Sequence, residues 1–148
     1  VNHVFGGGLS SRLFEEIREK RGLAYAVYSG VSAFEDAGAF QMYAGTLPQH
    51  ADEVRGLFQS ELARLVADGI TDDELDIAKG YLTGAFELGL EDNGARMARN
   101  GALLITSGEV RAIEDQVARW AAVDQNAVNA AIGDVLSAEP ITVTVGPT

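Results

Sequence analysis

Arg18 and Tyr25 are the residues of this sequence whose types and spacing best suit chemistry on a substrate. Arg18 lies at the end of a short charged segment, and Tyr25 follows Gly22, where we expect the chain to reverse. A guanidinium and a phenol hydroxyl are both donors, so the two groups could together hold a peptide carbonyl or a developing oxyanion. The residues alone leave a second interpretation open, in which Arg18 is a surface residue and Tyr25 packs in a sheet.

A glycine run precedes this segment and forms a candidate glycine loop, Gly6, Gly7 and Gly8. No lysine follows at the spacing of a phosphate-binding loop, and the third glycine of a dinucleotide fingerprint is missing. Ser10 lacks the closing glycine of a nucleophile elbow. The alternative is that these glycines let one backbone segment pass close to another before a helix begins.

The sequence contains two histidines, His3 and His50, and no cysteine. The segment His50-Ala51-Asp52-Glu53-Val54 approaches the inverted zinc motif His-x-x-Glu-His, but Val54 stands where the second histidine ligand would be. Pairs of carboxylates are adjacent in sequence and lie near expected helix ends, where they complement the helix dipole or are solvated. We therefore expect this chain to hold no metal, no cofactor and no catalytic residue of its own.

The hydrophobic pattern predicts the elements that position Arg18 and Tyr25. A short helix with apolar positions Leu13, Phe14 and Ile17 should end near Gly22. From Leu23 the period changes to two, and the second alternating run ends at Thr46, so we predict an antiparallel hairpin from Leu23 to Thr46. The alternation places on one face Tyr25, Val27 and Val31, and on the other face Ala24, Ala26, Tyr28 and Phe34.

Helical periodicity dominates the rest of the chain, which ends in a short predicted strand, Ile141 to Val145. The expected helices cover residues 48–69, 71–86, 95–105, 110–120 and 126–136. The predicted fold is α+β: an antiparallel-rich sheet, formed by the hairpin and the returning C-terminal strand, packed against several helices. Three strands are few for so many helices, so we expect an incomplete domain whose open sheet edge another chain covers.

The composition excludes two classes of partner. The formal net charge is −11, whereas nucleic-acid binding requires a clustered positive surface. No apolar run is long enough to span a bilayer, so we expect no membrane segment. The absence of cysteine leaves the compartment open, with a reducing cytoplasm as the default expectation.

Several segments in the same order resemble a known family: VFGGGLSSRLFEEIREKRGLAYAVYSG, then GAFQMYAGT, then TDDELDIAKGYLTGAF. They are similar to the second, C-terminal domain of the inverted-motif zinc peptidases, the family of pitrilysin, mitochondrial processing peptidase and insulin-degrading enzyme. The similarity is greatest to the bacterial processing-peptidase-like members. It covers nearly the whole chain and implies that residues 1–148 are the later part of the C-terminal domain.

The resemblance also implies a function. In that family the first domain carries the zinc motif, and the second closes the peptide chamber and donates an arginine and a tyrosine, seven positions apart, to the active site. Arg18 and Tyr25 match those positions, and the glycine run matches a loop that is longer in the α subunit of the processing peptidase. The resemblance thus implies a non-catalytic, substrate-binding domain, with zinc in the parent enzyme's other domain.

The implied partners are the catalytic domain of the same protein or a paired subunit, a peptide substrate, and a second copy in a homo-oligomer such as a dimer. Alone, the chain should be inactive because it lacks the zinc motif. The alternative within the same family is an inactive scaffold or assembly subunit.

The first testable prediction concerns metal content. Because Val54 replaces the second histidine of the zinc motif, the purified chain should contain far less than stoichiometric zinc after dialysis without chelator. Elemental analysis of the dialysed protein checks this expectation. A tight equimolar zinc complex would contradict it.

Overall fold

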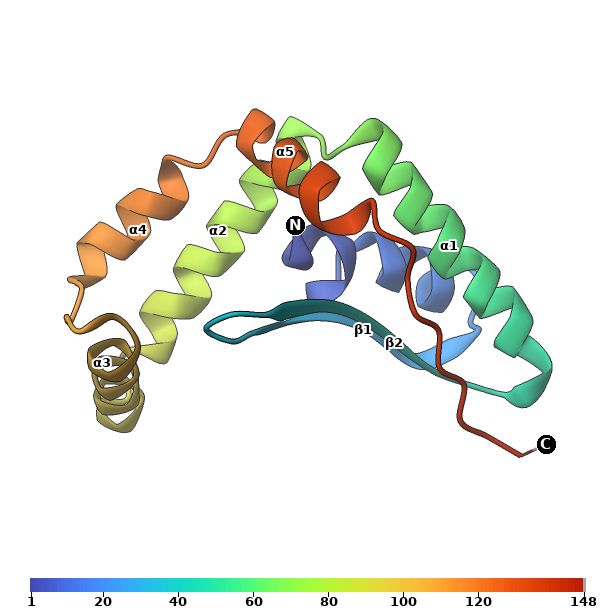
Figure 1. The fold of residues 1–148 in the computed structure, drawn as a ribbon, viewed down its shortest axis with the longest axis horizontal. Coiled ribbons are helices and arrows are strands. Elements are labelled where there is room, and N and C mark those ends of the chain that lie inside the picture. The colour runs from blue at the N-terminus through green and yellow to red at the C-terminus, as the bar shows by residue number, and fades with distance from the viewer. Residues whose placement is uncertain (148) are drawn as a thin grey trace. The chain divides into compact units, whose positions relative to one another are not determined.

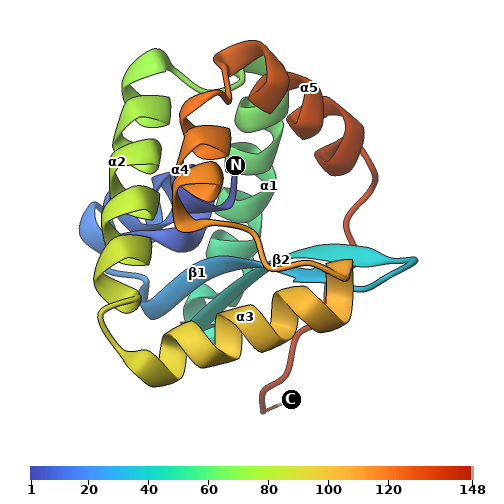
Figure 2. The ribbon, with the colours of Figure 1, turned by 90° about the vertical axis from the view of Figure 1, so that its left-hand side faces the viewer.

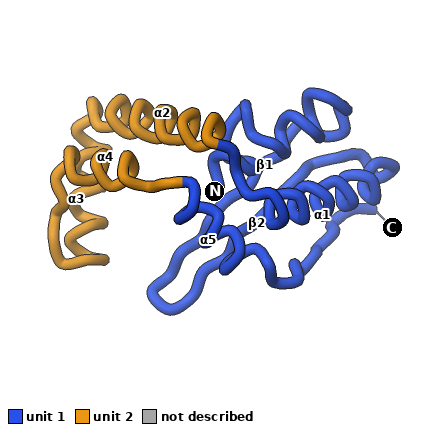
Figure 3. Tube along the Cα trace, turned by 90° about the horizontal axis from the view of Figure 1, so that it is seen from above, with its two compact units in different colours: residues 1–71, 125–148 blue, residues 72–124 orange. Residues whose placement is uncertain are grey.

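A computed structural model describes residues 1–147 of the chain. The chain divides into two compact units: Val1–Thr71 with Gln125–Thr148 form unit 1, and Asp72–Asp124 form unit 2 (Figure 3). None of the helices within the described residues is long and apolar enough to cross a membrane. The α+β class predicted from the sequence is confirmed, since a two-stranded antiparallel sheet is accompanied by several helices.

Unit 1 contains the predicted hairpin, β1 (Ala24–Ala33) and β2 (Gly38–Thr46), with helical segments packed against it (Figure 1). Two π-helical turns precede the hairpin, η1 (His3–Gly7) and η2 (Phe14–Glu19), and both pack against β1. The short 3₁₀ turn η3 (Pro48–His50) leads into α1 (Ala51–Asp68), and α5 (Gln125–Leu136) packs beside α1. The predicted helices over 48–69 and 126–136 are therefore confirmed.

The core of unit 1 lies between the helical segments and the inner face of the hairpin. Its fully buried apolar side chains are Phe5, Leu13, Ile17, Leu65 and Ile132. The Phe5 ring also meets the Phe40 ring of β2 at a centroid distance of 5.9 Å. Burial of these side chains is the main force that fixes η1 and η2 against β1, because such short turns are not stable alone.

A β-bulge interrupts the start of the hairpin. Ala24 pairs with Thr46 and Ala26 with Gly45, so Tyr25 is an extra residue without a partner on β2. Beyond the bulge Val27 is buried, whereas Tyr25 is 84% exposed. The prediction that Tyr25 and Val27 share a face is therefore wrong, because the extra residue shifts the alternation by one position.

The second correction concerns the returning C-terminal strand, Ile141 to Val145. Within residues 1–147 the sheet has two strands, and this segment pairs with neither of them. Its apolar residues Ile141, Val143 and Val145 are exposed. Alternation of apolar residues predicts the side-chain pattern of a strand, but a strand also needs a neighbouring edge with which to exchange hydrogen bonds.

The glycine run lies where η1 crosses β1. A Cβ atom on Gly6 would lie 2.5 Å from the Ser29 backbone nitrogen, so only glycine allows this approach. The Ser29 hydroxyl donates a hydrogen bond of 2.7 Å to Oδ1 of Asn2, which ties β1 to the start of the chain. At Gly6 this geometry agrees with the interpretation of the run as a close backbone approach.

The end of η2 is held by backbone and charged contacts. Gly22 has a φ of +63°, and its N–H donates to the Arg18 carbonyl oxygen. The Glu16 carboxylate accepts hydrogen bonds from the side chains of Lys20 and Arg21. The bond from Lys20, followed by that from Arg21, lowers the pKa of Glu16 to about 2.

Unit 2 is a three-helix arrangement of α2 (Asp72–Gly89), α3 (Asn93–Ser107) and α4 (Ile113–Ala121), which confirms the helices predicted for this region (Figure 2). Helices α2 and α4 lie side by side, and the Phe86 and Trp120 rings meet edge to face at 5.1 Å. The Asp92 side chain caps α3 by accepting from the Ala95 N–H, and Gly108 ends the helix in the left-handed conformation.

We predict that Gly6→Ala destabilises the chain by about 1–3 kcal/mol, because the new methyl group must push η1 away from the β1 backbone. The matched control is Gly56→Ala in α1, where an added Cβ meets no atom within 4 Å. This control should be as stable as the parent or more stable by up to about 1 kcal/mol. Urea denaturation followed by circular dichroism measures both. Equal stability of Gly6→Ala and the parent would contradict the close approach.

A second prediction follows from the lowered pKa of Glu16. A carboxyl group whose pKa is depressed on folding adds stability above its unfolded pKa, and this contribution disappears as the pH falls through the folded value. Glu16→Gln should therefore be less stable than the parent at pH 7, and the difference should fade between pH 4.5 and pH 2. Denaturation midpoints measured across this pH range test the prediction. A difference that does not change with pH would contradict the ionic role of Glu16.

Candidate functional site

The structure brings the two predicted site residues, Arg18 and Tyr25, into direct contact. Nη1 of Arg18 donates a hydrogen bond of 2.9 Å to the Tyr25 carbonyl oxygen. The guanidinium carbon also lies 4.8 Å from the centre of the Tyr25 ring. The ring quadrupole attracts a guanidinium that lies over an aromatic face. The hydrogen bond to the Tyr25 carbonyl additionally fixes the orientation of the Arg18 guanidinium. The expected convergence of these two side chains is thus observed.

Phe14 completes this arrangement. The guanidinium of Arg18 lies 4.8 Å from the centre of the Phe14 ring, so it has an aromatic contact on η2 as well as one on β1. Sequence reasoning counted Phe14 among the apolar positions of a helix and missed this contact. The signal that could have identified it is the spacing of four residues between Phe14 and Arg18, which places both side chains on one side of a helix.

Two backbone irregularities present the pair. Arg18 projects from the π-helical turn η2, and Tyr25 is the extra residue of the β-bulge. Between them the chain reverses at Gly22, and the Leu23 N–H donates to the Ile17 carbonyl oxygen. Because Ile17 and Leu23 are buried, the core anchors both ends of this reversal. Both kinds of irregularity are frequent at functional sites, where they redirect a side chain.

The chemistry available at the pair is donation of hydrogen bonds from an exposed position. The Tyr25 side chain projects into solvent, and its hydroxyl has no hydrogen-bond partner among residues 1–147. Arg18 is half-buried and uses one of its five N–H groups on the Tyr25 carbonyl. The phenol and the remaining guanidinium N–H groups can therefore bind a carbonyl oxygen or an oxyanion.

The other candidates from the sequence lie apart from this pair. The nearest atoms to added Cβ atoms at Gly6, Gly7 and Gly8 belong to Ser29, Asn2 and His3, respectively. Neither Arg18 nor Tyr25 is among these nearest neighbours of the glycine run.

His50 lies at the start of α1, where its Nδ1 is 3.9 Å from Oε2 of Glu53. Val54, at the position of the missing zinc ligand, is buried in the core. Within residues 1–147, histidine, aspartate and glutamate side chains form no group of three that could hold a metal ion. The residues present do not fit a zinc site.

Comparison with known proteins identifies the family of this fold. Residues 1–82 match the family model of the peptidase M16 inactive domain. The chain is 46% identical over 147 residues to an uncharacterized zinc protease of Streptomyces coelicolor and 44% identical over 147 residues to one of Mycobacterium tuberculosis. Each match covers 99% of this chain, but it covers only 32% and 34% of those relatives, so the chain spans about a third of their length.

A solved structure gives the same result. The crystal structure of a peptidase M16 inactive domain from Pseudomonas fluorescens superimposes with a TM-score of 0.81 at 30% sequence identity. The superposition covers 90% of this chain and 32% of that chain. Since the family model matches more than half of the sequence and the folds agree, the chain belongs to the peptidase M16 inactive-domain family.

Proposed function

We propose that this chain is the later part of the C-terminal domain of a zinc metalloendopeptidase, and that it binds substrate without carrying out the catalysis. In this role it closes the peptide chamber, and Arg18 and Tyr25 contribute to the active site. The observation that carries the proposal is the contact of Arg18 with the exposed Tyr25, whose hydroxyl has no partner in the described part of the chain, in a domain of this family.

The pair is suited to stabilise charge on a substrate oxygen. Phe14 and the Tyr25 carbonyl hold the Arg18 guanidinium in place, so its remaining donors are oriented before the substrate arrives. The Tyr25 hydroxyl can donate to the carbonyl oxygen of the peptide bond that is cut. Donors that are already in place stabilise an oxyanion more than a neutral carbonyl, and they therefore act mainly in the transition state.

The proposal assigns zinc to another domain. Within residues 1–147 the two histidines form no metal site with the carboxylates, and the matched zinc proteases are about three times longer than the chain. The partner is then the catalytic domain of the same protein or a paired subunit, and the whole assembly can contain a second copy. A cysteine-free sequence is compatible with the reducing cytoplasm, the location that we propose.

An inactive scaffold or assembly subunit is the second interpretation. A scaffold needs the packing of the Arg18 and Tyr25 side chains but not the phenol hydroxyl. The exposure of this hydroxyl favours the substrate-binding role, and a variant that removes only the hydroxyl distinguishes the two interpretations.

We expect Tyr25→Phe in the full-length parent protease to lower kcat by about 100- to 1000-fold, which corresponds to about 2.7–4 kcal/mol. The variant keeps the ring over Arg18, so folding and zinc content should be unchanged. The matched control is Tyr28→Phe, an exposed tyrosine three residues further along β1. Peptide cleavage assays on all three proteins measure the effect. If Tyr25→Phe kept full turnover, the hydroxyl would not be a donor to the substrate, and the role of Tyr25 would be structural.

Arg18→Lys tests the guanidinium. Lysine keeps the charge but loses the planar fork and the stacking on two rings, so we expect reduced kcat with unchanged zinc content. Arg21→Lys, on the same segment and paired with Glu16, should retain activity. Since both donors would serve one oxyanion, the losses in Arg18→Lys and Tyr25→Phe should not add in the double variant. Strictly additive losses would indicate two independent roles.

A further inference from the structure

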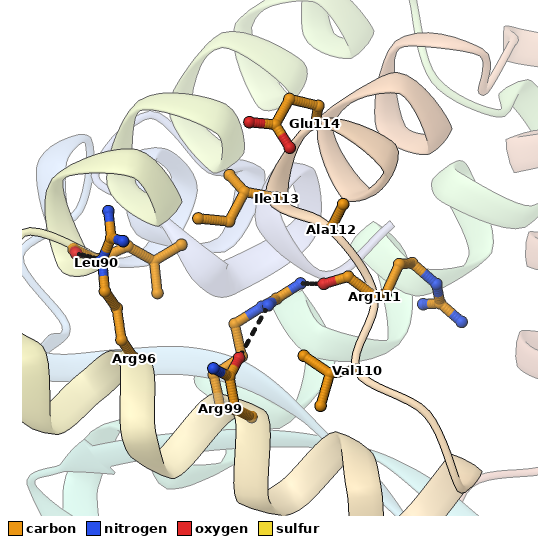
Figure 4. A pocket seen from close by; sticks show the side chains of 9 residues that line it. Leu90, Arg96, Arg99, Val110, Arg111, Ala112, Ile113 and Glu114 are labelled. Carbon is orange, nitrogen blue, oxygen red and sulfur yellow. Dashed lines mark hydrogen bonds between the residues drawn. The ribbon is translucent and has the colours of Figure 1, made fainter.

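Unit 2 contains a pocket that the proposed function does not use. Its volume is about 230 Å³, and it lies between the start of α3 and the segment that connects α3 to α4 (Figure 4). Two arginines of α3, Arg96 and Arg99, line this pocket together with apolar side chains. Since all of these residues belong to unit 2, the pocket exists within one compact unit.

Neutral groups hold the two guanidinium groups in place. Arg99 donates 2.8 Å and 3.3 Å hydrogen bonds to the Arg111 carbonyl oxygen and to Oδ1 of Asn100, and its guanidinium carbon lies 5.4 Å from the Phe86 ring centre. Nε of Arg96 donates to the Leu90 carbonyl oxygen. Each guanidinium has five N–H groups, so both retain donors that these bonds do not use. They are thus oriented and still able to bind a ligand.

The ion pairs found within the described part of the chain do not include Arg96 or Arg99. By contrast, Lys20, Arg21, Arg55 and Arg64 all have carboxylate partners. In a chain with a net charge of −11, two unpaired guanidinium groups at one pocket form a local field that attracts an anion.

The rest of the pocket restricts the ligand. Leu90, Val110 and Ile113 provide an apolar surface beside Arg99. The carboxylate of Glu114 lies across the pocket from Arg99 and lowers the local positive charge, so the pocket disfavours a ligand with more than one negative charge (Figure 4). Arg111 extends away from Arg99 and donates to Gln116, so it adds little to the binding surface (Figure 4). The pocket is smaller than the pockets of drug-sized ligands, which favours a group the size of one residue.

We propose that this pocket binds the C-terminal residue of a peptide. Its α-carboxylate accepts charge-assisted hydrogen bonds from Arg99 and Arg96, and its apolar side chain packs on Leu90, Val110 and Ile113. This site is independent of the Arg18–Tyr25 pair, since it is argued from unit 2 alone.

The test uses the whole chain, residues 1–148, labelled with ¹⁵N and titrated at low salt with small probes. N-acetyl-leucine carries both the carboxylate and the apolar side chain, and it should shift the amide signals of Val110 to Ile113 in a saturable way. N-acetyl-leucinamide lacks the charge and should cause no saturable shift. Equal binding of the two probes, or binding of neither, would overturn the proposal. If leucine bound more tightly than N-acetyl-leucine, the proposal of a peptide would be wrong, and the ligand would be a free amino acid.

Single substitutions test whether Arg99 and Arg96 bind the carboxylate of the probe. Arg99→Gln should weaken the binding of N-acetyl-leucine about tenfold or more, because it removes a charged donor. Arg55→Gln makes the same charge change on α1 and should bind like the parent. Because Arg99 also holds the Arg111 carbonyl, Arg96→Gln serves as a second variant, and circular dichroism verifies the helices of both. Parent-like affinity in both pocket variants would overturn the assignment.

Discussion

The hydrogen bond from Arg18 to the carbonyl of the bulged Tyr25 is the interaction on which the candidate site depends. The bulge turns Tyr25 outward while Val27 stays in the core, and the same carbonyl then orients the Arg18 guanidinium. The π-helical turn and the reversal at Gly22 bring the two residues within reach. The side chains of Ile17 and Leu23 are buried in the core and hold both ends of this reversal. Their burial therefore stabilises the β-bulge and the π-helical turn at the surface.

Two groups of arginines in this acidic chain have different physical consequences. Arg21, Arg55 and Arg64 are paired with nearby carboxylates, and such pairs at the surface contribute little to stability. Arg18, Arg96 and Arg99 instead bind neutral carbonyl oxygens and lie against aromatic or apolar groups. Among residues 1–147 no carboxylate forms an ion pair with them, and both proposed binding sites are built on guanidinium groups of this kind.

Much of the fold could be predicted from local patterns. The hairpin and the helices follow from a change of hydrophobic period between two and 3.6, and their bounds agree with the structure to within a few residues. The predicted strand from Ile141 to Val145 is wrong because alternation does not supply a pairing edge. The predicted face of Tyr25 is also wrong, because one residue without a partner on β2 reverses the alternation of faces. The residue types of the strand do not indicate where such a bulge occurs.

The sequence by itself determined the identity and spacing of Arg18 and Tyr25, the acidic net charge and the absence of a zinc motif, because these are properties of residue types and their order. Only the tertiary structure decided that Phe14 lies against Arg18, that Gly6 must approach Ser29, and that Arg96 and Arg99 meet at one pocket. Such contacts depend on how helices and strands pack and on where the backbone departs from regular geometry. Both are set by the burial of side chains that are distant in sequence, which no local pattern records.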